Sequence, residues 1–281
     1  MKTGFIILLS LALTISCGNG RTAKKENVES GNSTEASVSL QDGRPQIKQY
    51  TYKVVNTYPH DTGSFTQGLF WHDGHLYEGT GQYGESRLLK VDPRTGKALK
   101  EVKLPASYFG EGITWHDGRI YQVTWTQRRA MVYDGETFRQ EKVFSYSGEG
   151  WGITSDGKKL YMSDGTEKIY VRDPETFQIE RIITVTMGRN RLRNINELEW
   201  VDGEIWANIY QNQDNRVARI DPLTGYVTGI INFNGIQDKK DFSPDPDHVF
   251  NGIAYDPPTG DIYVTGKCWN KVYKVEITEV K

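Results

Sequence analysis

The sequence predicts an all-β domain in the form of a five-bladed β-propeller, and three observations lead to this prediction. From about residue 50 the chain consists of short alternating runs of apolar and polar residues, without a convincing stretch of helical periodicity. One sequence block recurs five times. The glycines that close the blocks stand at positions 74, 118, 157, 203 and 260, so consecutive ones are 44, 39, 46 and 57 residues apart. A period in the forties with about four short strands per unit is typical of propellers.

Each block is expected to supply the first strand of a blade and the turn into the second. The blocks are FTQGLFWHDG at 65–74, FGEGITWHDG at 109–118, EGWGITSDG at 149–157, NINELEWVDG at 194–203 and FNGIAYDPPTG at 250–260. Four of the five close with Asp-Gly, the sequence that hairpin turns favour. The strand after each turn carries Tyr77, Tyr121, Tyr161, Trp206 or Tyr263, and third strands end in VDPRTG, VYDGET, VRDPET and RIDPLTG.

The fifth repeat ends without a fourth strand, and this predicts how the ring closes. Residues 50–58 alternate like an isolated strand ahead of the first block. We expect this N-terminal strand to complete the last blade and so to close the ring. A β-sandwich is the alternative architecture, but a sandwich would not repeat its sequence.

The N-terminal residues predict export and attachment to a membrane. A basic residue precedes an apolar run over residues 5–15, which is too short to span a membrane. Residues 13–17, LTISC, resemble the lipid-attachment box of bacterial lipoproteins, with Thr14 where Leu is more usual. We therefore expect residues 1–17 to be a lipoprotein-type signal peptide that ends at a lipidated Cys17. An ordinary secretory signal peptide is the alternative.

The next segment predicts a spacer. Residues 18–48 contain almost no large apolar side chain and cannot bury enough surface to fold, so we interpret them as a disordered tether. The propeller is expected over residues 49–281, as a monomer anchored by lipid in the bacterial cell envelope, periplasmic or at the surface. If Cys17 is acylated, Cys268 has no partner for an intrachain disulfide.

Charge and composition exclude several classes of function. The 34 Lys and Arg residues are balanced by 36 Asp and Glu residues, so the formal net charge of -2 leaves no basic footprint for nucleic acid or anionic lipid. The two cysteines and five histidines form no cluster with zinc spacing. The polar stretch at 237–248 predicts a loop, in which Asp245 and Asp247 either bind calcium or are simply solvated. Their spacing fits no calcium loop.

Candidate site residues share a register among the repeats but differ in identity. Recurrent residues, such as the tryptophans before the turns and the histidines of the His-Asp-Gly turns, are expected to pack or to form turns. His60 and His248 stand apart from these and are too few for a histidine metal site. The first strand of a propeller blade lines the channel, so one register of that strand predicts a polar ring around the axis. Its members are Gln67, Glu111, Trp151, Asn196 and Asn251.

A second register, four residues after the recurrent Tyr or Trp, gives another ring. Its members are Gly81, Trp125, Gly165, Tyr210 and Lys267. The glycines leave space, the aromatic side chains supply walls and the lysine supplies a positive charge. The two rings together predict a concave site at one mouth of the channel, with Glu111 as the one carboxylate in the rings. A wet polar channel, as in propellers that only bind partners, is the alternative.

These motifs carry a resemblance to a known family. FTQG at 65–68, FGEG at 109–112, EGWG at 149–152, NELEW with WANIY, and NGIAYD with VTGK are similar to plant-type and bacterial glutaminyl-peptide cyclotransferases, also called glutaminyl cyclases. The resemblance covers about residues 50–278. It implies a five-bladed propeller unrelated to the zinc-dependent animal enzymes, and a channel mouth that receives the N-terminal glutamine of a peptide or protein. It carries into that pocket Phe65, Gln67, Phe109, Glu111, Trp125, Trp151, Asn196 and Lys267. Tyr210 stands where the plant enzymes have Trp.

The reaction that the resemblance implies is intramolecular. The free α-amine of the N-terminal Gln attacks its own side-chain carboxamide carbon, ammonia leaves, and a pyroglutamyl ring remains. Glu111 would accept the amine proton and deliver it to the departing nitrogen, while Lys267, with Gln67 or Asn196, would stabilise the oxyanion. The remaining residues, Phe65, Phe109, Trp125, Trp151, Tyr210 and Asn251, would bind the substrate. No cofactor is required, and the family allows a structural calcium in the channel whose ligands the sequence does not place.

Two other functions stay open at the level of sequence. A calcium-dependent lactonase propeller should supply several acids and amides to a channel metal, whereas the rings hold Glu111 with Lys267. A non-enzymatic propeller that binds protein partners would not need one acid and one cation within aromatic walls.

Overall fold

The described part of the chain is built almost entirely from β-strands. The computed structural model describes residues 40–41, 44–210 and 215–281, and within them the one helical element is the 3-10 turn η1 (Lys239–Asp241). No helix in these ranges is long and apolar enough to cross a membrane. The prediction of an all-β domain is therefore confirmed.

The predicted signal peptide and most of the predicted tether lie outside the described residues. By its internal contacts the chain divides into residues 1–37 and residues 38–281. Within the tether, β1 (Leu40–Gln41) and β2 (Arg44–Pro45) pair as a short antiparallel hairpin. Ile47 packs against a hydrophobic cluster. The described strands of the folded part therefore begin close to the boundary predicted at residue 49, with β3 at Lys48.

Three four-stranded antiparallel sheets follow one another along the chain. The first comprises β4 (Thr66–His72), β5 (His75–Thr80), β6 (Arg87–Asp92) and β7 (Lys97–Lys103). The second comprises β8 (Gly110–His116), β9 (Arg119–Thr124), β10 (Arg129–Asp134) and β11 (Gln140–Ser145). The third comprises β12 (Ile153–Ser155), β13 (Leu160–Ser163), β14 (Lys168–Arg172) and β15 (Ile179–Thr184).

Most of the remaining strands form one eight-stranded sheet in the order β18-β19-β20-β21-β3-β24-β23-β22. Its first half comprises β18 (Ile195–Val201), β19 (Glu204–Ile209), β20 (Arg216–Ile220) and β21 (Val227–Asn232). Its second half comprises β3 (Lys48–Pro59), β22 (Phe250–Asp256), β23 (Asp261–Gly266) and β24 (Lys271–Glu279). A small hairpin of β16 (Thr186–Met187) and β17 (Asn190–Arg191) precedes β18.

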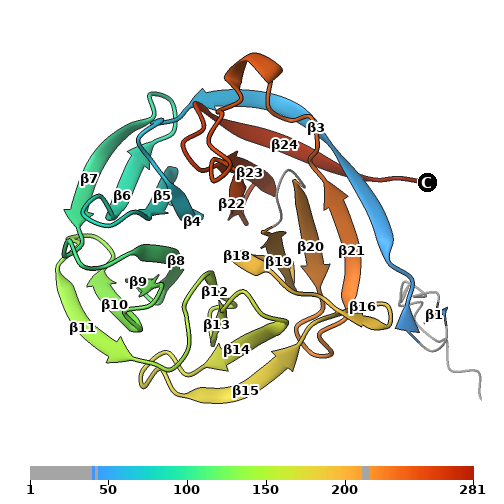
Figure 1. Cartoon of the computed structure of the whole chain (residues 1–281), viewed down its shortest axis with the longest axis horizontal. Coiled ribbons are helices and arrows are strands. Elements are labelled where there is room, and N and C mark those ends of the chain that lie inside the picture. Colours follow the sequence, from blue (N-terminus) through green and yellow to red (C-terminus); the bar gives the residue numbers. More distant parts are fainter. Residues whose placement is uncertain (1–39, 42–43, 211–214) are drawn as a thin grey trace, which may run out of the picture. The chain divides into compact units, whose positions relative to one another are not determined.

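Strand β3 connects the beginning and the end of the folded chain (Figure 1). It pairs antiparallel with β24, from Pro59 opposite Lys271 to Tyr50 opposite Glu279. Its pairing with β21 is parallel and extends only over residues 48–50. The strand predicted at 50–58 therefore lies within β3 and provides a fourth strand beside the last repeat.

Figure 1 shows the sheets of residues 38–281 around a common centre, with the first strand of each repeat nearest to it. Hydrophobic side chains fill the space between neighbouring sheets. Phe70 and Tyr77 of the first sheet, for example, pack with Ile113 and Ile120 of the second. Burial of each such side chain contributes roughly 1.5–3 kcal/mol. The inner strands are therefore held from both sides, and this gives a rigid frame to the groups at their ends.

The hairpin turns between the first and second strands adopt the predicted conformation. Asp117 and Gly118 both have positive φ, 46° and 76°, as a type I′ turn requires. The same holds at residues 73–74 and 202–203. Asp residues of the turns after the third strands accept hydrogen bonds from a Thr three residues later, as in the pair Asp92 and Thr95. The repeats therefore encode the turns directly.

Candidate active site

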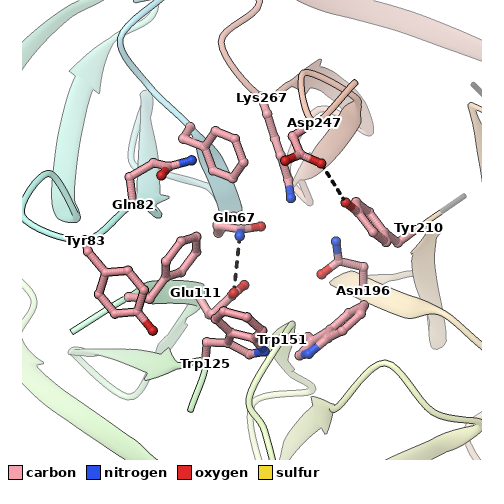
Figure 2. A pocket seen from close by; sticks show the side chains of 12 residues that line it. Gln67, Gln82, Tyr83, Glu111, Trp125, Trp151, Asn196, Tyr210, Asp247 and Lys267 are labelled. Carbon is pink, nitrogen blue, oxygen red and sulfur yellow. Dashed lines mark hydrogen bonds between the residues drawn. The ribbon is translucent and has the colours of Figure 1, made fainter. Parts of the chain in front are cut away.

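A cavity of about 410 Å³ opens at the centre of the sheets, and its walls combine charged and aromatic side chains (Figure 2). Nine of the ten side chains predicted for the site line it. They are Phe65, Gln67, Phe109, Glu111, Trp125, Trp151, Asn196, Tyr210 and Lys267. The sequence did not assign to the site three other lining residues, Gln82, Tyr83 and Asp247.

Irregularities in the first strands aim the side chains of the first ring into the cavity. The pairing register shifts between Thr66 and Gly68 in β4, and equivalent shifts in β8, β18 and β22 enclose Glu111, Asn196 and Asn251. A β-bulge adds an unpaired residue to one strand and re-aims its side chain. The repeats therefore place a polar residue at each bulge and regular pairing beyond it.

A recurrent backbone hydrogen bond brings the second ring to the same end of the sheets. The amide of Lys267 donates to the carbonyl of Val249 at 2.9 Å, two residues before Asn251. The amides of Gly81, Trp125 and Tyr210 make the equivalent bond in their own repeats. The third repeat departs from the pattern, because β12 begins only at Ile153 and Trp151 precedes the strand. The two rings found in the sequence are thus one site.

The two glycines of the second ring make room for aromatic side chains. A Cβ atom on Gly81 would lie 2.5 Å from a ring carbon of Phe109, and one on Gly165 would lie 2.6 Å from the ring of Trp151. Both distances are shorter than any side chain tolerates. The aromatic walls therefore depend on these glycines.

Glu111 and Lys267 are the buried charges of the cavity, with 5% and 4% of their surface exposed. Burial raises the pKa of Glu111 well above its usual range, and the nearby charge of Lys267 only partly opposes this. Burial also lowers the pKa of Lys267, against the charges of Glu111 and Asp247. Among the described residues, no carboxylate lies within ion-pair distance of Lys267 Nζ. Burial thus disfavours the charged form of each group, and the charge of each partly offsets this for the other.

Neutral partners complete the surroundings of both charges. Gln67 Nε2 donates to Glu111 Oε1 at 3.2 Å. Lys267 Nζ lies 4.7 Å from the centre of the Phe65 ring and 4.9 Å from that of Tyr210, within the range of cation–π attraction. Tyr210 donates its hydroxyl to Asp247 Oδ1 at 3.3 Å.

One carboxylate outside the lining fixes two walls of the cavity. Glu149 Oε2 accepts hydrogen bonds from Trp125 Nε1 at 2.7 Å and from Trp151 Nε1 at 2.9 Å. The indoles are therefore locked in place by one shared acceptor. Glu149 belongs to the EGWG motif, which pointed to the family. The equivalent positions of the other repeats carry no acid, so the comparison of repeats did not assign Glu149 to the site.

Asn251 lies behind the cavity and is not part of the lining. It is fully buried, and its Nδ2 donates to the carbonyl of Thr66 at 3.0 Å and to Gln67 Oε1 at 3.5 Å. Its position therefore supports Gln67 and gives it no contact with a substrate in the cavity. Asp247, by contrast, makes a second carboxylate at the mouth, so Glu111 is not the one acid of the site.

The acidic side chains around the channel, as far as the structure describes them, form no cluster for a calcium ion. Calcium takes six to eight oxygen ligands from carboxylates, backbone and amide carbonyls and water. In the described part of the chain no group of three His, Cys, Asp or Glu side chains could hold a metal ion. Glu197, the carboxylate of the bulge in β18, already accepts the amides of Leu69 and Ile253 on its two oxygens, at 3.3 and 3.0 Å.

Fold and site define an all-β, propeller-like protein with a buried acid and a buried base inside aromatic walls. Residues 27–277 match the glutamine cyclotransferase family. The glutaminyl-peptide cyclotransferase of Arabidopsis thaliana is 36% identical over 255 residues, which cover 89% of this chain and 77% of that protein. The crystal structure of Myxococcus xanthus glutaminyl cyclase aligns with a TM-score of 0.78 at 32% identity, over 84% of this chain and 100% of that one. The chain belongs to the glutamine cyclotransferase family, which confirms the resemblance found in the sequence.

Proposed function

We propose that the cavity is the active site in which this family member, a glutaminyl-peptide cyclotransferase, converts the N-terminal glutamine of peptides to pyroglutamate and ammonia. Family membership assigns the activity. One observation carries the site: Glu111 and Lys267 are buried in the same aromatic cavity, with shifted pKa values and without an ion pair between them. Perturbed titratable groups in a concave site mark catalytic machinery.

The raised pKa of Glu111 suits the proton transfers that the reaction needs. The substrate amine and Glu111 together carry one proton, as ammonium with carboxylate or as free amine with carboxylic acid. Burial favours the second pair, in which the amine can attack the carboxamide carbon. After attack, the carboxylic acid gives its proton to the departing nitrogen and the carboxylate takes the proton of the new ammonium. Ammonia and a lactam result, and Glu111 ends in its starting state.

The oxygen of the carboxamide gains negative charge as the amine adds. Lys267 Nζ, placed between the Phe65 and Tyr210 rings, is the cation available for that oxygen. Amide donors from Gln67 or Asn196 would complete the oxyanion site. Such preorganised donors act strongly because Glu111, Lys267, Gln67 and Asn196 are buried, where charges interact more strongly than in water.

The aromatic walls supply orientation. Trp125, Trp151 and Tyr210 surround a cavity of about 410 Å³, which suits a glutaminyl side chain with its backbone. Ring closure needs the amine within about 3–3.5 Å of the carboxamide carbon, and rigid walls favour that folded conformer. The indoles held by Glu149 support this role.

We propose that the cyclisation needs no cofactor. Every proton and charge in the scheme is supplied by Glu111, Lys267 and the substrate. Neither the lactonase nor the partner-binding alternative accounts for family membership together with a buried acid and base.

We propose that the fold is a five-bladed propeller closed by β3. The eight-stranded sheet divides into two blades at the short parallel contact between β21 and β3, since β3 pairs far more extensively with β24. Five hydrophobic clusters support this count, because each joins two neighbouring blades.

We propose that Cys17 is lipidated and holds a monomeric enzyme in the bacterial cell envelope. The support comes from sequence: an apolar run over residues 5–15, then Ser16-Cys17 and a polar tether. Intact-mass analysis of protein from the membrane fraction tests this. Acyl mass on a chain that begins at Cys17 supports the anchor, and a chain that begins elsewhere without it means a secreted enzyme.

Activity is tested by following ammonia release from a dipeptide with N-terminal Gln. The matched control is the same dipeptide with an acetylated amine, which cannot cyclise. We expect release only from the free amine and undiminished activity in excess chelator. Activity lost on chelation and restored by zinc would contradict the metal-free scheme.

A further inference from the structure

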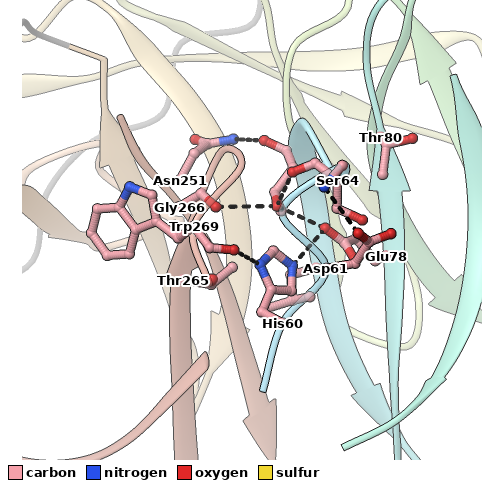
Figure 3. A network of polar contacts seen from close by, with 12 residues as sticks. His60, Asp61, Ser64, Glu78, Thr80, Asn251, Thr265, Gly266 and Trp269 are labelled. Atoms are coloured by element: carbon pink, nitrogen blue, oxygen red, sulfur yellow. Dashed lines mark hydrogen bonds and ion pairs between the residues drawn. The ribbon is translucent and has the colours of Figure 1, made fainter. Parts of the chain in front are cut away.

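We propose that a buried ion pair, His60 with Glu78, positions Lys267 for the cyclisation, a role that rests on the proposed function. His60 lies in the connection between β3 and β4, and Glu78 lies on β5 (Figure 3). Neither touches the cavity. Their side chains are only 4% and 2% exposed, and His60 Nε2 stands 3.1 Å from Glu78 Oε1.

The hydrogen bonds favour a positively charged imidazole. His60 Nδ1 lies 2.7 Å from the carbonyl oxygen of Trp269, which can only accept. Glu78 Oε1 accepts the hydroxyl of Thr66 at 2.7 Å as well as the bond from His60. A carboxylate at Glu78 can only accept, and in this ion pair both ring nitrogens donate, as in an imidazolium. Burial alone lowers the pKa of His60, but the charge and hydrogen bond of Glu78 and the Trp269 carbonyl outweigh it and raise the pKa.

Other titratable groups face this pair from the surrounding segments. Asp61, next along the chain, and Cys268, from the turn after β23, flank it, and Arg87 of β6 pairs with Asp61 at 3.5 Å. The charge of Asp61 also raises the pKa of His60. Since Arg87 is engaged by Asp61, Glu78 remains the direct counter-charge of the imidazolium.

The His60 side chain holds the turn that follows Lys267. The turn after β23 leaves Cys268 at a φ of 56°, an unusual value for a residue with a side chain. Several hydrogen bonds hold this turn against the segment that leads into the first sheet. The Cys268 amide donates to the Ser64 carbonyl at 2.8 Å, the His60 amide donates to the Asn270 carbonyl at 3.1 Å, and the Trp269 carbonyl accepts from the His60 ring. Without the His60 ring the strained turn loses its bond at the Trp269 carbonyl, two residues after Lys267, and Lys267 Nζ shifts.

The same network reaches the other wall of the site. Thr66, which donates to Glu78, directly precedes Gln67. Its carbonyl accepts from Asn251, the residue behind Gln67. One buried ion pair therefore links the turn that carries Lys267 with the bulge that carries Gln67, across the junction of the last and first repeats.

The test is a double-mutant cycle of Glu78→Gln with Lys267→Gln, using a Gln dipeptide and enzyme in excess where turnover is slow. Glu78→Gln keeps the shape of the side chain and removes the charge. We expect it to lower kcat by about 10- to 100-fold with KM nearly unchanged, because a misplaced catalytic group costs that much. In the Lys267→Gln background we expect a further loss below about twofold, because the positioned group is gone. His116→Gln, a buried histidine at a turn outside the site, is the control and should leave kcat unchanged.

A second measurement does not depend on activity. The ring-proton NMR signal of His60, assigned by its loss in His60→Gln, should keep imidazolium shifts above its ordinary pKa of about 6.5. Equal losses from Glu78→Gln in both backgrounds, or an unchanged kcat in the wild-type background, would overturn the positioning role. A neutral His60 near pH 7 would overturn the charged pair. Failure of the wild-type protein to cyclise any Gln peptide would instead refute the proposed function and leave the NMR result standing.

Discussion

The first strand of each repeat has one end at the cavity and one end at a hairpin turn, and the repeats conserve different features at these two ends. In β8, Glu111 stands in the bulge at the cavity, while five residues on His116 stands at the hairpin turn. At the turn end the repeats share their residues, and the aromatic rings of these residues stack. The ring centres of His72 and Trp115 lie 3.7 Å apart, and those of Trp71 and Tyr263 lie 4.4 Å apart. At the cavity end the repeats share only the register, and the side chains differ in charge, size and shape.

This difference indicates that the residues at the turn end stabilise the fold, whereas those at the cavity end serve the reaction. Residues at the turn end have hydrogen-bond and stacking partners, as when His116 Nδ1 meets the Ser155 hydroxyl at 2.8 Å. At the cavity end the buried Oδ1 atoms of Asn196 and Asn251 have no hydrogen-bond partner among the residues that the structure describes. Unsatisfied buried groups cost stability and are retained where function needs them.

Glu111→Gln compared with His116→Gln is the strongest test of that division. Without a proton to relay, Glu111→Gln should lose about 10²–10⁴-fold in kcat while peptide binding changes little. Its unfolding temperature should not fall, because the amide is neutral like the protonated carboxyl group and can accept the bond from Gln67. His116→Gln should keep kcat and lose about 1–2 kcal/mol of unfolding free energy. Steady-state kinetics with a competitive inhibitor and thermal unfolding supply both readouts.

Two outcomes would contradict this prediction. If Glu111 only anchors the substrate amine by charge, Glu111→Gln weakens binding several-fold and spares the maximal rate. If the two ends of β8 are not distinct, His116→Gln lowers kcat as well.

A smaller effect is expected from Glu199, a buried acid of β18 on the side of the turns. Burial raises its pKa from 4.5 to about 8. The folded protein therefore holds a proton that the unfolded chain has lost, and this contribution to stability is complete below pH 4.5 and lost as the pH rises toward about 8. Glu199→Gln cannot ionise. Relative to the wild type, its unfolding free energy should therefore increase as the pH rises from 4.5 to about 8. Urea unfolding at several pH values checks this, with the exposed Glu136→Gln as the control that should track the wild type.

The smallest effect is expected from Tyr210→Phe. The ring wall and the cation–π contact to Lys267 remain, and only the hydroxyl bond to the exposed Asp247 at 3.3 Å is lost. We expect kcat/KM to fall by no more than about threefold. A fall beyond about tenfold would mean that the hydroxyl takes part in the chemistry.

The sequence predicted those parts of the molecule that recur in every repeat. Five blocks with Asp-Gly turns predicted the strands and hairpins, and the positive φ values of Asp117 and Gly118 follow from that pair. Two registers predicted which side chains converge, because every repeat places the same positions at the same end of its sheet. Glu111 and Lys267, 156 positions apart (267 − 111), were thereby assigned to one site.

The rest of the site could not be predicted because it lies outside the repeat. Asp247 belongs to the loop before the fifth block, which has no counterpart in the other repeats, so no register places it at the mouth. Asn251 shares the register of Gln67 but is shorter by one methylene and turns to the Thr66 carbonyl. The pair of His60 and Glu78 joins the segment after β3 to β5 of the first sheet, a contact that no local pattern contains.

The account depends most on one claim: burial keeps Glu111 protonated, so that the substrate amine is free to attack. Difference infrared spectroscopy of the wild type against Glu111→Gln reads that protonation state directly. We predict a carboxylic acid band from Glu111 that persists at about pH 6, where exposed carboxyl groups have ionised. A Glu111 that is already fully ionised at about pH 5 would contradict the proton shuttle.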